Sequence, residues 1–216
     1  MNLTLRFQQL AEDLCHYGRI LYNNDWSPAT SSNYSARLDD QYCALTSSGK
    51  HKGELTQADI LVVDWQGRAV NPEGISNRGK PSAETLLHTQ IYQRYPQAGA
   101  VLHTHSRNAV LLSALWPQAE LELTGWELQK AIEGQNSHES RLVIPIVDND
   151  QNIPRMAEGL DPLLLPECRA YLIRGHGIYT WGHNLADCFR HLEALDHLCA
   201  YQLELIRLGQ MESRQP

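Results

Sequence analysis

The stretch AVLHTHSRNAV, residues 100–110, decides the fold prediction, because an apolar run that ends in two histidines is followed directly by a helical pattern. The apolar run reads as a short buried strand, and Asn108–Leu115 fit a helix that Pro117 stops. In an extended strand, residues two apart point to the same side, so His103 and His105 face one place. The stretch therefore predicts a strand that leads into a helix, with the beginning of a metal site between them.

Segments on both sides of this stretch alternate between the same two patterns. Helical apolar spacing predicts helices at residues 3–23, 82–95 and 126–132, and a last helix between an N-cap at Asn184 and a stop at Gly209. NNDWSPATSSNYSARLDD predicts a loop and turn that lead into a strand. Apolar and β-branched runs predict further strands in YCALTSSG, in a hairpin ILVVDWQGRAV, in RLVIPIV, and in a strand pair AYLIRGHGIYTWG. The alternation predicts an α/β layered fold, and with no visible linker residues 1–216 are expected to form a single domain.

Composition excludes several classes of protein. The 216 residues carry a net charge of −7 with only 18 scattered Lys and Arg residues, which argues against a nucleic-acid binder. No apolar run approaches the roughly 20 residues needed to span a bilayer, and the N-terminus reads as a surface helix rather than a signal peptide. Five cysteines without a C-x-x-C pair are expected to be reduced core residues in a cytoplasmic protein.

A third histidine is needed before the H-x-H pair means more than two polar residues that face water. His176 is the candidate, since the flanking glycines in RGHG allow a tight turn at a strand end. Three neutral imidazoles with an open position are a common arrangement for catalytic zinc, whereas structural zinc prefers four protein ligands. Taken alone, His176 also fits an ordinary loop histidine.

Two further stretches offer material for binding an anion. TSSGKHKG, residues 46–53, supplies hydroxyls, backbone N–H groups and the lysines Lys50 and Lys52, although its composition also fits a plain solvent turn. GKPSAETLLH, residues 79–88, puts Ser82 and Glu84 at a helix start, where unpaired N–H groups favour phosphate. Glu84 is either a helix-capping residue or a carboxylate directed at the metal cleft.

Taken in order, TSSGKHKGELTQADILVVD, KPSAETLLHTQIY, AVLHTHS and LIRGHGIYTWG resemble the class II aldolase/adducin family over roughly residues 8–205. The resemblance implies a three-layer αβα sandwich around a mixed, largely antiparallel sheet. It also implies one zinc ion per subunit and a homotetramer whose active sites lie between neighbouring subunits.

Carried over from the family, the site residues fall into three groups. The resemblance implies His103, His105 and His176 as metal ligands, and Glu127 and Glu84 as catalytic carboxylates. The substrate and phosphate contacts that it implies are Asn33, Ser47, Ser48, Gly49 and Ser82. The division of labour between the carboxylates stays open, because the glutamate matching Glu84 is the acid/base in the family's aldolases and is replaced by cysteine in some of its dehydratases.

Within the family, the segment from His103 to Ile132 together with RLVIPIVDN is most similar to the dehydratases of methionine salvage, which release water from a methylthio-substituted pentulose phosphate. A sugar-phosphate aldolase or epimerase is the alternative, and a non-catalytic adducin-like interaction module is a third reading. Trp116 and Trp126 are possible members of a pocket for the methylthio group, or plain core residues. Among the other histidines, His191 and His197 are expected at the surface or in subunit contacts, and no partner is identified for His51, His88, His138 and His183.

Overall fold

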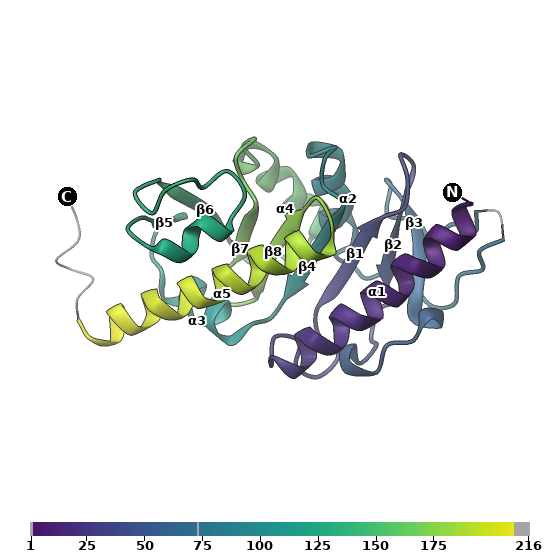
Figure 1. The fold of residues 1–216 in the computed structure, drawn as a ribbon, viewed down its shortest axis with the longest axis horizontal. Helices are drawn as coiled ribbons and strands as arrows, with labels where there is room; N and C mark the ends of the chain where they lie inside the picture. Colours follow the sequence, from purple (N-terminus) through teal and green to yellow (C-terminus); the bar gives the residue numbers. More distant parts are fainter. Residues whose placement is uncertain (1, 73, 210–216) are drawn as a thin grey trace.

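Eight strands form one mixed sheet in the computed structural model, which describes residues 2–72 and 74–209 (Figure 1). The strands lie in the order β3-β2-β1-β4-β8-β7-β6-β5, and all neighbours are antiparallel except β6 and β7. Their bounds are β1 Asn33–Arg37, β2 Tyr42–Thr46, β3 Ile60–Asp64, β4 Ala100–Thr104, β5 Glu120–Leu123, β6 Leu142–Val147, β7 Ala170–Ile173 and β8 Gly177–Gly182. β4 is therefore central, with β1 on one side and β8 on the other.

Helices cover both faces of the sheet (Figure 1). Side chains of α1, α3 and α5 pack with alternate strand residues such as Ala100 and Leu102, whereas α2 and α4 pack with the opposite set, which includes Val101. The helices span α1 Leu3–Asn23, α2 Thr85–Arg94, α3 Arg107–Leu115, α4 Ile153–Leu160 and α5 Leu185–Arg207. Because successive residues of a strand point to opposite faces, the buried strands need apolar residues on both sides. The predicted three-layer αβα architecture is confirmed.

The long helix α5 begins and ends where local chemistry predicts. The Asn184 side chain accepts a hydrogen bond from the backbone N–H of Asp187 at 2.9 Å, and Asn184 itself keeps an extended backbone conformation. This satisfies one of the N–H groups that a helix start leaves without a partner. Gly209 lies two residues past the end with φ +66°, a conformation that costs glycine little. The predicted cap and stop are both confirmed.

Several short elements differ from the sequence-based expectation. The helix α4 and the edge strand β5 were not predicted, since each spans eight residues or fewer and their patterns are too short to show periodicity. The expected hairpin after β3 has only an isolated bridge between Val63 and Ala69 in place of a second strand. Residues 126–132 form a 3-10 helix, η3, over Glu127–Ala131 rather than an α-helix. The other 3-10 helices are η1 Lys52–Glu54, η2 Gln57–Asp59 and η4 Asp161–Leu163.

The five cysteines are buried, as expected of core residues. Within the described part of the chain, no helix combines the length and apolarity that crossing a membrane requires.

Candidate metal centre and substrate pocket

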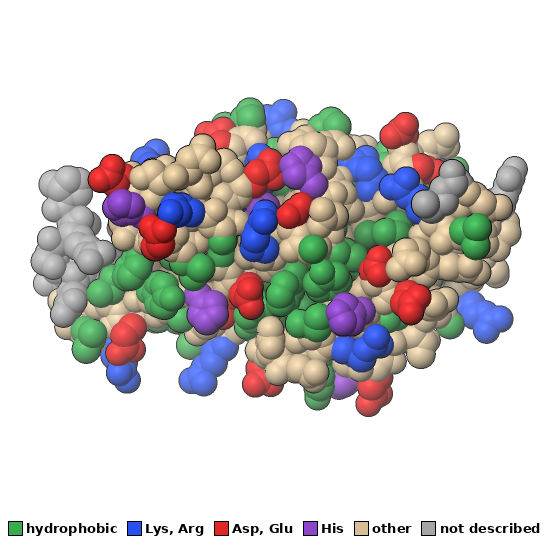
Figure 2. All heavy atoms as spheres, viewed as in Figure 1, with side chains coloured by type: hydrophobic (Ala, Val, Ile, Leu, Met, Phe, Trp, Pro, Cys, Tyr) green, Lys and Arg blue, Asp and Glu red, His purple; other side chains and the backbone are tan. Residues whose placement is uncertain are grey.

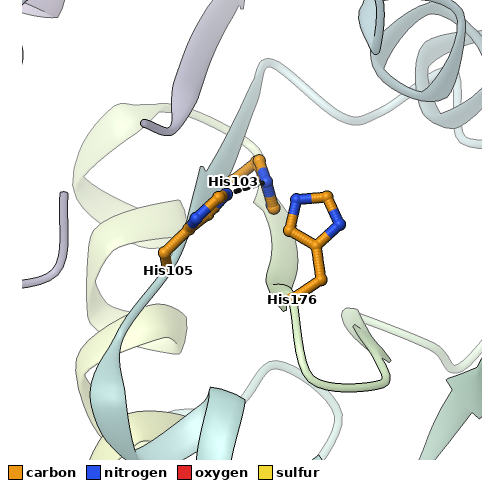
Figure 3. A group of neighbouring side chains, drawn as sticks. All are labelled: His103, His105 and His176. Carbon is orange, nitrogen blue, oxygen red and sulfur yellow. Dashed lines mark hydrogen bonds between the residues drawn. The ribbon is translucent and has the colours of Figure 1, made fainter. Parts of the chain in front are cut away.

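Two histidines at the end of the central strand bring their ring nitrogens together. His103 is the fourth residue of β4 and has no exposed surface, and the backbone N–H of His105, just past the strand, donates to the Trp26 carbonyl at 2.9 Å. The Nε2 atoms of the two rings are 3.0 Å apart (Figure 3). Side chains two apart on a strand share a side, so the spacing alone accounts for this convergence.

His176 comes to the same place from the loop between β7 and β8, and faces the other two rings (Figure 3). Its ring centroid lies 5.1 Å from that of His103 and 4.7 Å from that of His105. The loop turns through Gly175, whose φ of +64° is unfavourable for other residues. The Gly175 N–H donates to the buried Ser113 hydroxyl at 3.0 Å, and Arg174 donates to the Ser113 carbonyl at 2.9 Å, so the loop is tied to α3. The position of His176 therefore depends on contacts far away in sequence.

The chemistry of this donor set fits a metal ion. The three candidate ligand nitrogens lie within 4.8 Å of one another, and nitrogens bound to zinc at about 2.0–2.1 Å in tetrahedral geometry are about 3.3 Å apart. His103 Nδ1 lies 3.1 Å from the Ile178 carbonyl, and His176 Nδ1 lies 3.3 Å from the Asn149 side-chain oxygen. A carbonyl oxygen can only accept, so both Nδ1 atoms donate and both Nε2 atoms keep a lone pair. Such partners orient ligand imidazoles in metal sites.

Burial and neighbouring rings keep His103 and His105 neutral. Burial, followed by the neighbouring His105 and His176, holds the pKa of His103 well below its usual range. Burial and the nearby His176 lower the pKa of His105 to about 4. Both rings are thus deprotonated near pH 7, which is the state that binds a metal. His103 Nε2 keeps its lone pair, so His105 Nε2 can donate to it across the 3.0 Å between them, and a bound cation would take the place of that proton.

Glu84 is the carboxylate that the structure brings to the histidines. It precedes α2, and its oxygens lie 3.2 Å from His176 Nε2 and 3.5 Å from His103 Nε2. The Asn33 side-chain amide donates to Glu84 Oε2 at 2.7 Å. Helix capping by the Glu84 side chain is not observed among the described contacts, so its carboxylate belongs to the cleft.

A pocket of about 160 Å³ opens beside these side chains. It is lined by Thr30, Ser31, Ser32, Asn33, Ser47, Ser48, Gly49, Ser82, Glu84, His105 and His176. All five residues expected to contact substrate or phosphate are in this set. Besides the histidines, Asn33 and Glu84, the lining consists of hydroxyl-bearing residues and Gly49 of the turn after β2, where backbone N–H groups and serines suit an anion.

The two lysines of this loop lie outside the set of lining residues. Lys50 pairs with Asp59 at 2.8 Å. Lys52 is 1% exposed and donates to the carbonyls of Lys50 at 2.7 Å and Thr30 at 3.3 Å, so it links the two loops that line the pocket. Burial lowers the pKa of Lys52 to about 8.

Comparison with known proteins identifies the family. Residues 12–203 match the model of the class II aldolase and adducin N-terminal domain. The chain belongs to the class II aldolase/adducin family. It is 52% identical over 206 residues to the methylthioribulose-1-phosphate dehydratase of Marinobacter nauticus, covering 94% of this chain and 97% of that protein. It is also 52% identical over 207 residues to the enzyme of the same name from Hahella chejuensis, with the same coverage of 94% and 97%.

Solved structures of the class II aldolase/adducin family share the fold. One is an L-fuculose 1-phosphate aldolase, which superposes with a TM-score of 0.77 at 23% identity, covering 93% of this chain and 88% of that one. Another is the L-fuculose-1-phosphate aldolase of Thermus thermophilus, with a TM-score of 0.69 at 26% identity and 96% coverage of both chains. The architecture implied by the sequence resemblance is therefore shared by these structures.

Glu127, the other expected carboxylate, lies elsewhere in the subunit. It is the first residue of η3, its side chain is 73% exposed, and it pairs with Lys130. It lies 4.0 Å from His138 and is absent from the set of residues that line the described pocket. The two tryptophans proposed for a tail pocket are also outside that set: Trp116 donates to the Glu120 carbonyl at 2.8 Å, and Trp126 packs on Tyr201.

Two histidines differ from their expected roles. The prediction that His191 lies at the surface or in a subunit contact is wrong: it is fully buried, its Nδ1 donates to the Trp181 carbonyl at 2.8 Å, and its Nε2 accepts from the Glu133 N–H at 3.2 Å. His88, for which no partner was identified, is fully buried and contacts Asn33 and Ser35. One signal was available for His88, since it follows Glu84 by four residues at a helix start, a spacing that places both on one face.

Proposed function

We propose that this protein is a zinc-dependent lyase that converts 5-methylthioribulose 1-phosphate to 2,3-diketo-5-methylthiopentyl 1-phosphate in methionine salvage. The single observation that carries the proposal is the 52% identity, over 94% of the chain, to proteins named methylthioribulose-1-phosphate dehydratase. The pocket supports it, because its lining includes both histidines and a hydroxyl-rich turn, and a sugar phosphate needs both a carbonyl site and an anion site. A non-catalytic module would have no need for such a convergent set.

The reaction is an elimination next to a ketone. The C3–H bond breaks and gives its proton to a base, the C4–O bond breaks, and the hydroxyl leaves as water once it has received a proton. The enol that remains becomes the 3-ketone by moving one proton to C4, so the product is the substrate minus water. When bound, zinc would polarise the C2 carbonyl and stabilise negative charge that develops as C3 loses its proton.

Glu84 is our candidate for the proton carrier supplied by the same subunit. Its Oε2 is held by the Asn33 amide, and its Oε1 is directed toward His176, so the carboxylate has a defined orientation beside the carbonyl site. A carboxylate within reach of both substrate carbons can take the C3 proton and return it to the C4 hydroxyl. The serines and Gly49 that line the pocket would hold the phosphate.

Glu127 is our candidate for a proton carrier supplied by a neighbouring subunit of the expected homotetramer. Tyr201 of α5 packs on Trp126, the residue before Glu127, and is exposed, as are Leu111 and Leu115 of α3, the helix that packs on α5. Exposed apolar residues of this kind suit a subunit contact. Figure 2 shows hydrophobic side chains gathered on the face that carries α5. A carboxylate on such a surface can reach a pocket only across an interface.

The position of Glu84 favours a sugar-phosphate aldolase as the second candidate function, because that glutamate alone contacts the histidines within the described subunit. An aldolase would break a carbon–carbon bond with the same carbonyl site. The two functions differ in product: the dehydratase releases water, and the aldolase splits the carbon chain.

The test measures product from 5-methylthioribulose 1-phosphate and from fuculose 1-phosphate, using zinc-loaded wild type, Glu84→Gln and Glu127→Gln. Release of water without sugar cleavage supports the dehydratase, and cleavage that depends on Glu84 supports the aldolase. Mixed oligomers of Glu127→Gln with His103→Ala then test the interface. Activity recovers if Glu127 serves a neighbour's histidines, and stays absent if it serves its own.

A further inference from the structure

A continuous line of buried polar side chains runs from the interior of the α2 layer to the pocket. Tyr92 and Ser35 begin it, His88 lies in the middle, and Asn33 ends it at Glu84. The four side chains before Glu84 are at most 5% exposed. Their contacts are Tyr92 Oη to Ser35 Oγ at 2.9 Å, Ser35 Oγ to His88 Nδ1 at 2.7 Å, a short contact from His88 Nε2 to Asn33 Oδ1, and Asn33 Nδ2 to Glu84 Oε2 at 2.7 Å.

The carboxylate decides the direction of every hydrogen bond in this line. An ionised Glu84 can only accept, so the Asn33 amide must turn its N–H group toward Glu84 and its oxygen toward His88. The amide oxygen can only accept, so His88 Nε2 carries the proton. A neutral ring then leaves Nδ1 as an acceptor for the Ser35 hydroxyl, which in turn accepts from Tyr92.

We propose that His88 is a positioning residue for the reaction: its Nε2–H group holds the Asn33 amide in the one orientation that presents an N–H donor to Glu84. Without that donor, the amide oxygen loses its buried partner and only Ser82 and Glu84 still hold the Asn33 side chain, so the N–H group that lies 2.7 Å from Glu84 Oε2 is no longer fixed in place. All donors in the line point the same way, so each bond polarises the next. Burial, which lowers the pKa of His88 to about 3, agrees with a neutral ring.

Filling space in the core does not by itself require a polar ring at position 88. His88 lies between the strand β1 and the pocket, and its ring also packs against Tyr179, which stacks on His103. An apolar side chain of similar size would fill the same space in the core. The polar ring is instead placed where it reaches the one amide that contacts both Ser82 and Glu84.

Two substitutions of His88 distinguish the roles of its two ring nitrogens. Glutamine places an amide nitrogen near the Nε2 position and keeps a donor for Asn33, whereas asparagine keeps only an atom near the Nδ1 position for Ser35. His88→Gln is expected to keep kcat within about threefold of wild type. His88→Asn is expected to lose about tenfold or more in kcat with little change in KM, the size expected for losing one hydrogen bond to a charged group.

The control is His191→Asn, because His191 is equally buried and bonded through both nitrogens but joins α5 to β8 and to the loop after η3. It is expected to lower the melting temperature without changing kcat. Equal losses of kcat in the Gln and Asn variants of His88, in proportion to their melting temperatures, would overturn the proposal.

The kinetic arm rests on the proposed function, so a second measurement is made without substrate. Long-range ¹H–¹⁵N spectra of the metal-loaded wild type report which ring nitrogen of His88 carries the proton. Protonation at Nε2 is expected, and protonation at Nδ1 would refute the arrangement whatever the enzyme's substrate proves to be. If the spectra agree while neither substrate reacts, the proposed function has failed and the positioning of Glu84 has not.

Discussion

Gly177 follows His176 and packs closely against the end of β4, which carries His103. Replacing Gly177 with alanine tests whether the spacing of the histidines depends on this close approach of the two strands. A methyl group at Gly177 would lie 2.2 Å from the Thr104 carbonyl oxygen and 3.1 Å from Cε1 of His103. The backbone conformation of Gly177 is available to alanine, so the collision is the only cost. The perturbation therefore acts on the distance between β8 and the end of β4.

The expected magnitude follows from that distance. A carbon and a carbonyl oxygen in contact are normally about 3.3 Å apart, so the two strands must separate by about 1 Å at this point. Overpacking of this kind costs about 1–3 kcal/mol of unfolding free energy. Metal–ligand distances tolerate only about 0.2 Å, so a shift of 1 Å between His176 and His103 should lower zinc affinity at least about tenfold.

The assay is zinc competition with a chromogenic chelator, combined with urea denaturation of the metal-free protein. Gly175→Ala is the matched control on the other side of His176, because a methyl group there meets open space but φ is +64°. It should lose about 1–2 kcal/mol to backbone strain and much less zinc affinity than Gly177→Ala. If Gly177→Ala binds zinc as tightly as wild type, the histidines do not depend on the close approach of these strands.

Three further predictions concern stability. His88 has a pKa near 6.5 in the unfolded chain and about 3 in the folded protein, so the unfolded chain binds the extra proton and the free energy of unfolding falls as pH drops through this range. In urea denaturation between pH 6.5 and 5, wild type should lose about 2 kcal/mol more than His88→Gln. Equal losses in the two proteins would contradict this. Lys52 has a pKa of about 8 in the folded protein against 10.5 in the unfolded chain. As pH rises from 8 to 10.5, the free energy of unfolding of wild type should therefore increase by at most about 3 kcal/mol relative to Lys52→Met. Parallel plots of unfolding free energy against pH would rule out a buried ammonium. Asn184→Ala should cost about 1 kcal/mol through loss of the α5 cap, with Asn184→Ser as the control that keeps an acceptor; identical melting temperatures would refute the capping role.

Local patterns predicted those parts of the fold that depend on neighbouring residues. The helix cap at Asn184 and the strand β4 were predicted from the types of residues next to them in the sequence. The short elements β5 and α4 were not predicted, because four to eight residues give too little periodicity to distinguish a strand or helix from a loop. The burial of His191 was also not predicted, because its two hydrogen-bond partners lie outside its own helix, in β8 and in the loop after η3.

By itself, the sequence determined that His103 and His105 share one side of a strand, because a two-residue spacing in extended chain leaves no alternative. The RGHG turn and the helix start at residue 84 offered His176 and Glu84 as candidates, and family resemblance added Glu127, without saying which carboxylate lies beside the ligands. Only the tertiary structure brought Glu84 to the histidines and left Glu127 exposed on another surface. It alone also joined His88 to Asn33, because a hydrogen bond between residues 55 apart in the chain exists only once β1 and α2 are packed together.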